Sequence, residues 1–202
     1  PGLEIITLPL EPTGTCLEDY DLPKEDDPIW GSWRRLFASP YFRRIWILQE
    51  YVLAKDLHIQ FGKAQGSADI MLLVFGAIER RSRRLNAKYM SCDDLSLSQN
   101  AYAGWVAFKQ MVMQRVFTRS DIYNTGPIDR RLISLLPTGL TLEATDPRDK
   151  IYGLLGLVSD AEDFMDLVSY QVSDTYPTIY RRFARRLIEK GSLIEVLRMT
   201  CG

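Results

Sequence analysis

The fold is set by one apolar stretch, LFASPYFRRIWILQEYVLAK, at residues 36–55. Ser39-Pro40 ends a preceding helix, and the residues after it predict a second helix over 41–55. Apolar side chains cover almost every side of this second helix, which is typical of a buried helix. Glu50 interrupts the apolar surface, one turn after Trp46. A carboxylate there is expected to be desolvated, with a raised pKa unless a cation lies beside it.

Regular elements are predicted on both sides of this helix. Asp27-Pro28 indicates a helix start, with Asp as N-cap and Pro in the first turn. LHIQF at 57–61 alternates and is followed by Gly62, which predicts a short strand. Its backbone needs a partner, either residues 3–8 or a segment of another part or copy of the protein. Further helices are predicted over 69–85, 98–118, 129–136, 146–156 and 174–190, with a short apolar segment at 193–197.

Composition narrows the class of protein. The chain has 202 residues, 46% hydrophobic and 25% charged, which is enough for a sizeable core. No apolar run reaches membrane-spanning length, and a net charge of −1 argues against general polyanion binding. Residues 1–29 carry eight acids and one base, an acidic leader. Three scattered cysteines and a single histidine, His58, favour a reducing, cytoplasmic setting and predict no metal site.

A second distinctive stretch is ATDPRDKIYGLLGL, at residues 144–157. Asp146 is expected to cap a helix, with Pro147 as its first residue. Asp149 follows three residues after the cap, as in a capping box. Arg148 is expected to reach either Glu50 or a loop carbonyl. The three charged residues Asp146, Arg148 and Asp149 are therefore interpreted as a structural motif rather than as catalytic groups.

Residues 36–50 and residues 144–157, in this order and about a hundred residues apart, closely resemble blocks of the heterokaryon-incompatibility (HET) domain proteins of filamentous fungi. Ser169-Tyr170, followed by Tyr176 and Tyr180, adds to the resemblance. The family's front blocks, Tyr-x-Ala-Leu-Ser-Tyr-x-Trp-Gly and Trp-Ile-Asp-x-x-Cys-Ile-Asn-Gln, are not in this sequence. The chain, which begins with Pro1, is therefore interpreted as a piece of a longer protein that lacks the N-terminal half of its own domain.

The resemblance implies a fold that is mainly α with one or two short β-strands. It would comprise the back half of an α/β domain similar to Toll/interleukin-1-receptor (TIR) domains and a helical extension. The expected division is an acidic irregular leader at 1–27, the end of the HET core at 28–62, and the extension at 63–202. The implied role is non-self recognition and programmed cell death. Many TIR domains cleave NAD⁺ through a glutamate in a Trp-x-x-x-Glu helix, a spacing that Trp46 and Glu50 match.

Glu50 is thus the candidate catalytic residue and NAD⁺ the candidate substrate, with no cofactor firmly implied. Its carboxylate would stabilise an oxocarbenium-like transition state or orient ribose hydroxyls. The alternative is a structural ion pair with Arg43, Arg44 or Arg148. Arg43 and Arg44 are candidates to hold a phosphate or, alternatively, to anchor acidic neighbours. Trp46 is a candidate to stack on a base or, alternatively, a core residue.

A second function class stays open beside the enzyme. Helix-rich sequence without a phosphate-cradling glycine loop favours a non-enzymatic helical interaction or assembly module, with a protein partner or self-association. Arg181, Arg182, Arg185 and Arg186 form one face of the helix predicted at 174–190. No aromatic residue is interleaved on that face, so it is interpreted as a solvated surface and not as a specific nucleic-acid site.

Overall fold

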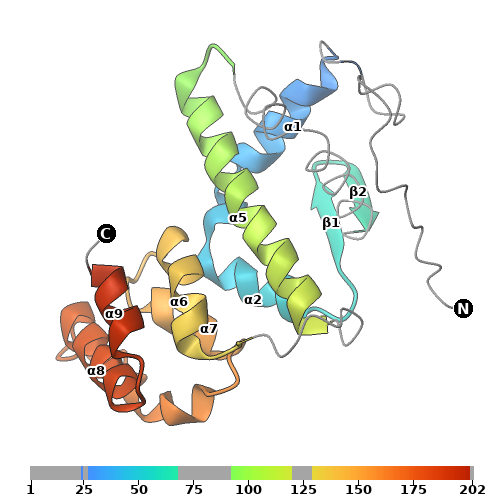
Figure 1. The fold of residues 1–202 in the computed structure, drawn as a ribbon. Coiled ribbons are helices and arrows are strands. Elements are labelled where there is room, and N and C mark those ends of the chain that lie inside the picture. Colours follow the sequence, from blue (N-terminus) through green and yellow to red (C-terminus); the bar gives the residue numbers. More distant parts are fainter. Residues whose placement is uncertain (1–23, 25–26, 68–91, 120–128, 201–202) are drawn as a thin grey trace, which may run out of the picture. The chain divides into compact units, whose positions relative to one another are not determined.

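The structure is a computed structural model that describes residues 24, 27–67, 92–119 and 129–200 (Figure 1). These residues are mostly helical, with a single two-stranded sheet among them, which confirms a mainly α fold with short strands. None of the helices within these ranges combines the length and the apolarity needed to cross a bilayer. The elements are α1 (Ile29–Ala38), η2 (Pro40–Arg43), α2 (Ile45–Leu53), β1 (His58–Phe61), β2 (Ala64–Ser67), α5 (Leu95–Arg119), α6 (Leu132–Thr141), α7 (Asp149–Leu155), η3 (Ala161–Asp163), η4 (Met165–Leu167), α8 (Tyr176–Glu189) and α9 (Leu193–Thr200).

The chain divides into two compact units. The first comprises residues 1–39 and 57–102, and the second comprises 40–56 and 103–202. This division follows contacts in space. The division of the sequence into a leader, a core end at 28–62 and an extension at 63–202 follows the family blocks and stays a prediction.

The first unit contains α1 and the β-hairpin. The side chain of Asp27 accepts a hydrogen bond from the amide of Ile29 at 2.8 Å, which confirms the predicted start of α1. The predicted strand is confirmed as β1, which pairs antiparallel with β2 from His58 opposite Ser67 to Phe61 opposite Ala64. The sequence did not indicate β2, because AQGS contains no β-branched or aromatic residue. Residues 3–8, the partner suggested by the sequence, lie outside the described residues.

The core of the second unit forms where α2, α6 and α7 pack together. Phe108 of α5 is fully buried, and its ring lies 5.7 Å from that of Phe42 and 5.5 Å from that of Tyr51, both edge-on. Arg115 is also buried, and its guanidinium donates hydrogen bonds to the carbonyls of Tyr51 and Ala54, each at 2.7 Å. This arginine satisfies the free carbonyls at the C-terminal end of α2 and fixes that end of the helix.

The last two helices follow the predicted pattern. The apolar stripe of α8 is buried through Ile179, Phe183 and Leu187, and Phe164 stacks on Phe183 with the ring centroids 5.6 Å apart. The helix ends before Gly191, whose φ of 90° suits glycine. The apolar segment predicted at 193–197 belongs to α9.

Several boundaries differ from the prediction. α5 begins at Leu95 rather than at 98, because Asp94 caps it by accepting the amide of Leu97 at 3.0 Å. α6 begins at Leu132 rather than at 129, where a carboxylate oxygen of Asp160 accepts the Leu132 amide at 2.8 Å. α6 also continues through Pro137 to Thr141. The helix predicted over 69–85 lies outside the described residues.

Candidate functional site

The two distinctive stretches meet in the second unit. The amide of Ile45 donates to the carbonyl of Glu143 at 2.9 Å, and the amide of Glu143 donates to the carbonyl of Arg43 at 2.6 Å. The guanidinium of Arg43 also pairs with the Glu143 carboxylate at 2.8 Å. Arg43 therefore anchors an acidic neighbour, as the alternative to phosphate binding predicted. Arg44 begins α2 as its N-cap in an extended conformation, and its side chain is exposed.

Glycines allow α2 and α7 to approach closely. A Cβ added at Gly153 would lie 2.6 Å from Cγ1 of Ile45, and one added at Gly156 would lie 3.0 Å from the side-chain amide of Gln49. Such short separations leave no room for a side chain at Gly153. The glycines of the second stretch are thus explained by its packing on the first.

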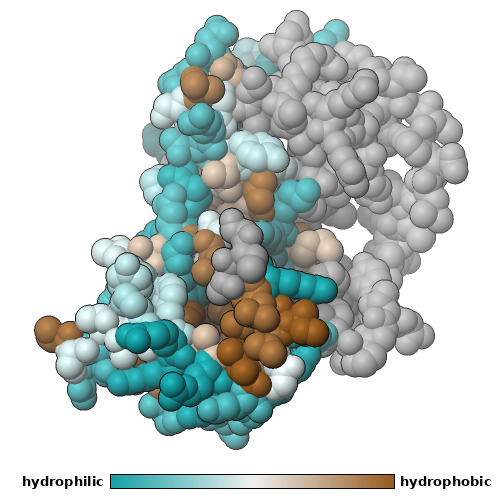
Figure 2. All heavy atoms as spheres, turned by 60° about the vertical axis from the view of Figure 1, so that its left-hand side comes forward, coloured by the Kyte–Doolittle hydropathy of each residue, from teal (hydrophilic) through white to brown (hydrophobic). Residues whose placement is uncertain are grey.

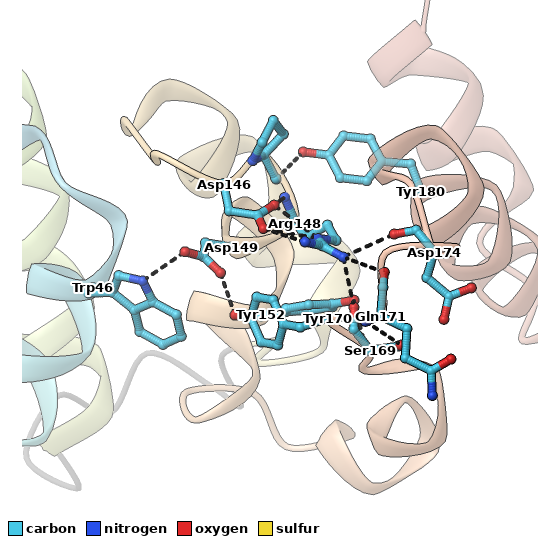
Figure 3. Close-up of polar contacts among 11 residues, drawn as sticks. Trp46, Asp146, Arg148, Asp149, Tyr152, Ser169, Tyr170, Gln171, Asp174 and Tyr180 are labelled. Atoms are coloured by element: carbon cyan, nitrogen blue, oxygen red, sulfur yellow. Dashed lines mark hydrogen bonds and ion pairs between the residues drawn. The ribbon is translucent and has the colours of Figure 1, made fainter.

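Asp146 and Arg148 form the centre of a polar cluster (Figure 3). Asp146 accepts the Arg148 amide at 2.9 Å and pairs with the Arg148 guanidinium at 2.6 Å. Hydrogen bonds from Arg148 hold the pKa of the Asp146 carboxyl below its usual value. The same guanidinium donates to the carbonyls of Ser169, Gln171 and Asp174, the last at 3.0 Å. The expectation that Arg148 contacts a loop carbonyl is confirmed, and its contact with Glu50 is not formed.

Asp149 joins two aromatic side chains. One carboxylate oxygen accepts a hydrogen bond from the indole N–H of Trp46 at 3.1 Å, and the other accepts one from the Tyr170 hydroxyl at 2.5 Å (Figure 3). Burial, and then the hydrogen bond to Asp149, raise the pKa of Tyr170 well above its usual value. The expected capping box is wrong, because Asp149 binds these aromatic groups rather than the amide of Asp146. α7 also begins at Asp149 rather than at Pro147, and Asp146 accepts the Arg148 amide in the turn that precedes the helix.

Three further residues complete the cluster. The Tyr152 hydroxyl donates to the carbonyl of Ser169 at 3.0 Å and accepts the Ser169 amide at 3.1 Å. The Tyr180 hydroxyl donates to the carbonyl of Pro147 at 2.5 Å. Ser169, Tyr170 and Tyr180 carried a sequence signal, since they belong to the family-like pattern. Tyr152 lies inside the second stretch, but nothing in the sequence pointed to its partner.

Glu50 lies outside this cluster. The side chain is exposed, so the expected desolvation of its carboxylate is wrong. Only one side of α2 is buried, and Trp46 and Leu53 are exposed by 37% and 52%. The core alternative for Trp46 is wrong for the same reason. The predicted ion pair of Glu50 with Arg43, Arg44 or Arg148 is also wrong: within the described part of the chain, Glu50 has no ion pair. The negative charge of Glu50 adds to burial in raising the pKa of Tyr41, a nearby residue that is half exposed.

Known proteins support the family resemblance. Over 172 residues the chain is 24% identical to the heterokaryon incompatibility protein 6, OR allele, of Neurospora crassa. The chain is similar to heterokaryon-incompatibility proteins. The alignment covers 81% of this chain and 24% of the Neurospora protein, so the chain spans about a quarter of that relative's length. No family model and no solved structure matches the chain. The remoter TIR resemblance stays a prediction.

The two distinctive stretches and the segment 169–180 are thus joined by hydrogen bonds. The first stretch supplies Trp46, the second supplies Asp146, Arg148 and Asp149, and the segment 169–180 supplies tyrosines and carbonyls. Across the described ranges, no cluster of three or more His, Cys, Asp or Glu could hold a metal ion. The chemistry of the cluster is hydrogen bonding between protein groups, which positions these segments relative to one another.

Proposed function

We propose that this chain is part of a heterokaryon-incompatibility protein that acts in non-self recognition in the cytoplasm, and that it serves there as a helical interaction module. One observation carries the proposal: Arg148 and Asp149 of the second stretch bind other protein segments, and Asp146 holds Arg148 in place. Asp146, Arg148 and Asp149 each have at least one partner within 3.1 Å. Such contacts make the surface rigid. A rigid, preformed surface suits an interface that recognises a protein partner or a second copy of the chain.

Exposed aromatic residues give this module a recognition surface. Trp46 is exposed by 37% and Tyr170 by 53%, and both are held by Asp149. Tyrosine and tryptophan dominate the binding energy of many interfaces, because they bury large areas at low cost in side-chain entropy. Holding both rings through one carboxylate reduces that cost further.

Asp149→Asn in the intact protein tests the module. We expect a weaker concentration-dependent association in analytical ultracentrifugation and a weaker incompatibility reaction between fungal strains, at an unchanged folded fraction. Asp163→Asn is the matched control, because its carboxylate contacts Lys190 and no group of the cluster. A protein that stays monomeric and without a partner at every concentration, while the reaction is intact, would contradict the proposal.

NAD⁺ cleavage leading to cell death is the second candidate, and the exposure of Glu50 favours it. A carboxylate that is in solvent and without an ion pair in the described chain is available to a ligand. Trp46, one turn earlier, is exposed as well and offers a face for stacking. In this candidate the Glu50 carboxylate stabilises positive charge at the ribosyl carbon as the nicotinamide leaves. Arg44, exposed at the start of α2, is available to pair with a phosphate.

NAD⁺ loss over time in the intact protein separates the two candidates. Wild type is compared with Glu50→Gln and with Glu162→Gln, which removes an exposed carboxylate in η3. Loss that stops only in Glu50→Gln supports cleavage through this residue. Equal loss in all three moves the chemistry elsewhere in the protein. An absence of loss in folded, assembled protein leaves the interaction module as the function.

A further inference from the structure

A groove beside α8 collects positive charge in the second unit. Its volume is about 420 Å³, within the range of small-molecule sites. Figure 2 shows broad hydrophilic surface over the C-terminal helices, interrupted by a hydrophobic patch. Four of the lining residues are arginines and one is a glutamate, Glu189; the full lining is Leu167, Thr178, Arg181, Arg182, Arg185, Arg186 and Glu189.

Two of the four arginines are already held by carboxylates. Arg182 pairs with Asp174 at 3.0 Å, and Arg186 pairs with Asp166 at 2.9 Å. Arg186 also donates to the carbonyl of Asp163. These contacts fix the two guanidinium groups at the groove and leave their charge largely compensated.

The other two arginines of the groove, Arg181 and Arg185, are not held by a carboxylate among the described residues. Within these ranges, the Arg181 guanidinium donates one hydrogen bond, to the carbonyl of Pro177 at 3.3 Å. Arg181 and Arg185 are four residues apart on α8, so their side chains lie on the same face with Cβ atoms about 6 Å apart. Glu189 also lines the groove, but it forms no ion pair with either of them among the described residues. Two guanidinium groups at that spacing can donate hydrogen bonds to one anion.

We propose that this groove binds a phosphate-bearing ligand, with Arg181 and Arg185 bridging one phosphoryl group. A phosphate offers three oxygens and close to two negative charges, so it can accept bidentate hydrogen bonds from both guanidinium groups at once. A single carboxylate, with two oxygens, matches one guanidinium group, as Asp166 does for Arg186. Leu167 and the stems of the arginines provide apolar wall for the remainder of the ligand.

Calorimetric titration of the full chain with pyrophosphate tests the proposal. We expect saturable binding that weakens with salt, and that falls about 30-fold or more in R181Q/R185Q, because each lost guanidinium group removes charge-assisted hydrogen bonds. The control K63Q/R198Q removes two exposed positive charges outside the groove and should bind as wild type does. Circular dichroism verifies that all three are folded.

Two further arms identify the source of the phosphate. Vesicles of phosphatidylcholine with a few per cent phosphatidylinositol bisphosphate are compared with phosphatidylcholine alone. The ligand is a lipid headgroup if the protein binds the phosphoinositide vesicles more tightly than pyrophosphate and R181Q/R185Q loses this binding. The ligand is a soluble molecule if the protein binds pyrophosphate but not the vesicles. A titration with polyglutamate provides the comparison with acidic protein. The proposal is overturned by the absence of binding to both phosphate probes, by equal losses in the two double variants, or by stronger binding of polyglutamate.

Discussion

Gly153 in α7 is where the two distinctive stretches pack most closely. A Cβ at this position would lie 2.6 Å from Cγ1 of Ile45 and 3.5 Å from its Cγ2. Ile45 is fully buried, and its β-branched side chain has little rotameric freedom in a helix. The side chain cannot rotate away from an added methyl group, so Gly153→Ala should force the two helices apart.

The expected cost follows from two opposing effects. Overpacking a buried contact costs about 1–3 kcal/mol. Replacing a helical glycine by alanine returns about 1 kcal/mol through helix propensity. The free energy of unfolding should therefore fall by up to about 2 kcal/mol. Gly156→Ala is the matched control: the nearest atoms there, at 3.0 Å, belong to the flexible end of Gln49, so we expect a change within about 0.5 kcal/mol.

A double-mutant cycle isolates the contact itself. Ile45→Ala alone should cost about 2–5 kcal/mol, because it opens a cavity. Adding Gly153→Ala to that variant places a methyl group in the cavity, so the double variant should be at least about 1 kcal/mol more stable than the two single changes predict by addition. Urea unfolding followed by circular dichroism measures all four proteins. Additive effects, or a Gly153→Ala protein that is more stable than wild type, would refute the packing argument.

Three more predictions concern the same unit, and urea unfolding tests each. Arg115→Met should lower the free energy of unfolding by about 3 kcal/mol, since buried carbonyls at the end of α2 lose their donors; no loss would contradict their burial. The folded-state pKa of Asp146 is depressed, so the stability that this carboxylate contributes is present above about pH 4 and is lost as the pH falls through the folded pKa. Asp146→Asn should therefore make the free energy of unfolding depend less on pH in the acidic range. The same pH dependence in wild type and in Asp146→Asn would contradict this. Trp46→Phe should cost about 1 kcal/mol, and Asp149→Ala, which removes both acceptor oxygens, about 2 kcal/mol. The double variant should cost less than their sum, because both changes remove the hydrogen bond between Trp46 and Asp149; additivity would show that this bond is not formed.

The sequence predicted those features of the fold that depend on neighbouring residues. The stripe of α8 and its end before Gly191 follow from helical periodicity and from a residue that tolerates positive φ. The start of α1 was predicted from Asp27-Pro28 in the same way, because an Asp that accepts a nearby amide and a Pro in the first turn are local signals. β2 was missed because its four residues carry no strand preference, and the hairpin forms through backbone pairing with β1.

The candidate site depends on contacts that periodicity does not encode. Asp149 has the position of a capping-box residue, yet its partners are 103 residues before it and 21 residues after it. Asp160 caps α6 from 28 residues downstream, which moves the start of that helix. Family resemblance indicated which residues matter, including Trp46 and Tyr170, but the bonds that join them became visible only in three dimensions.

The exposure of Glu50 changes what its mutation can reveal. A buried carboxylate would have linked any loss of activity in Glu50→Gln to a loss of stability. An exposed carboxylate without an ion pair in the described chain should be replaceable by glutamine with a change in unfolding free energy within about 0.5 kcal/mol. A loss of NAD⁺ cleavage in that variant would therefore report on chemistry alone. Asp149→Asn, by contrast, should weaken the contacts between α2, α7 and the 169–180 segment, so its association is compared with wild type at a matched folded fraction.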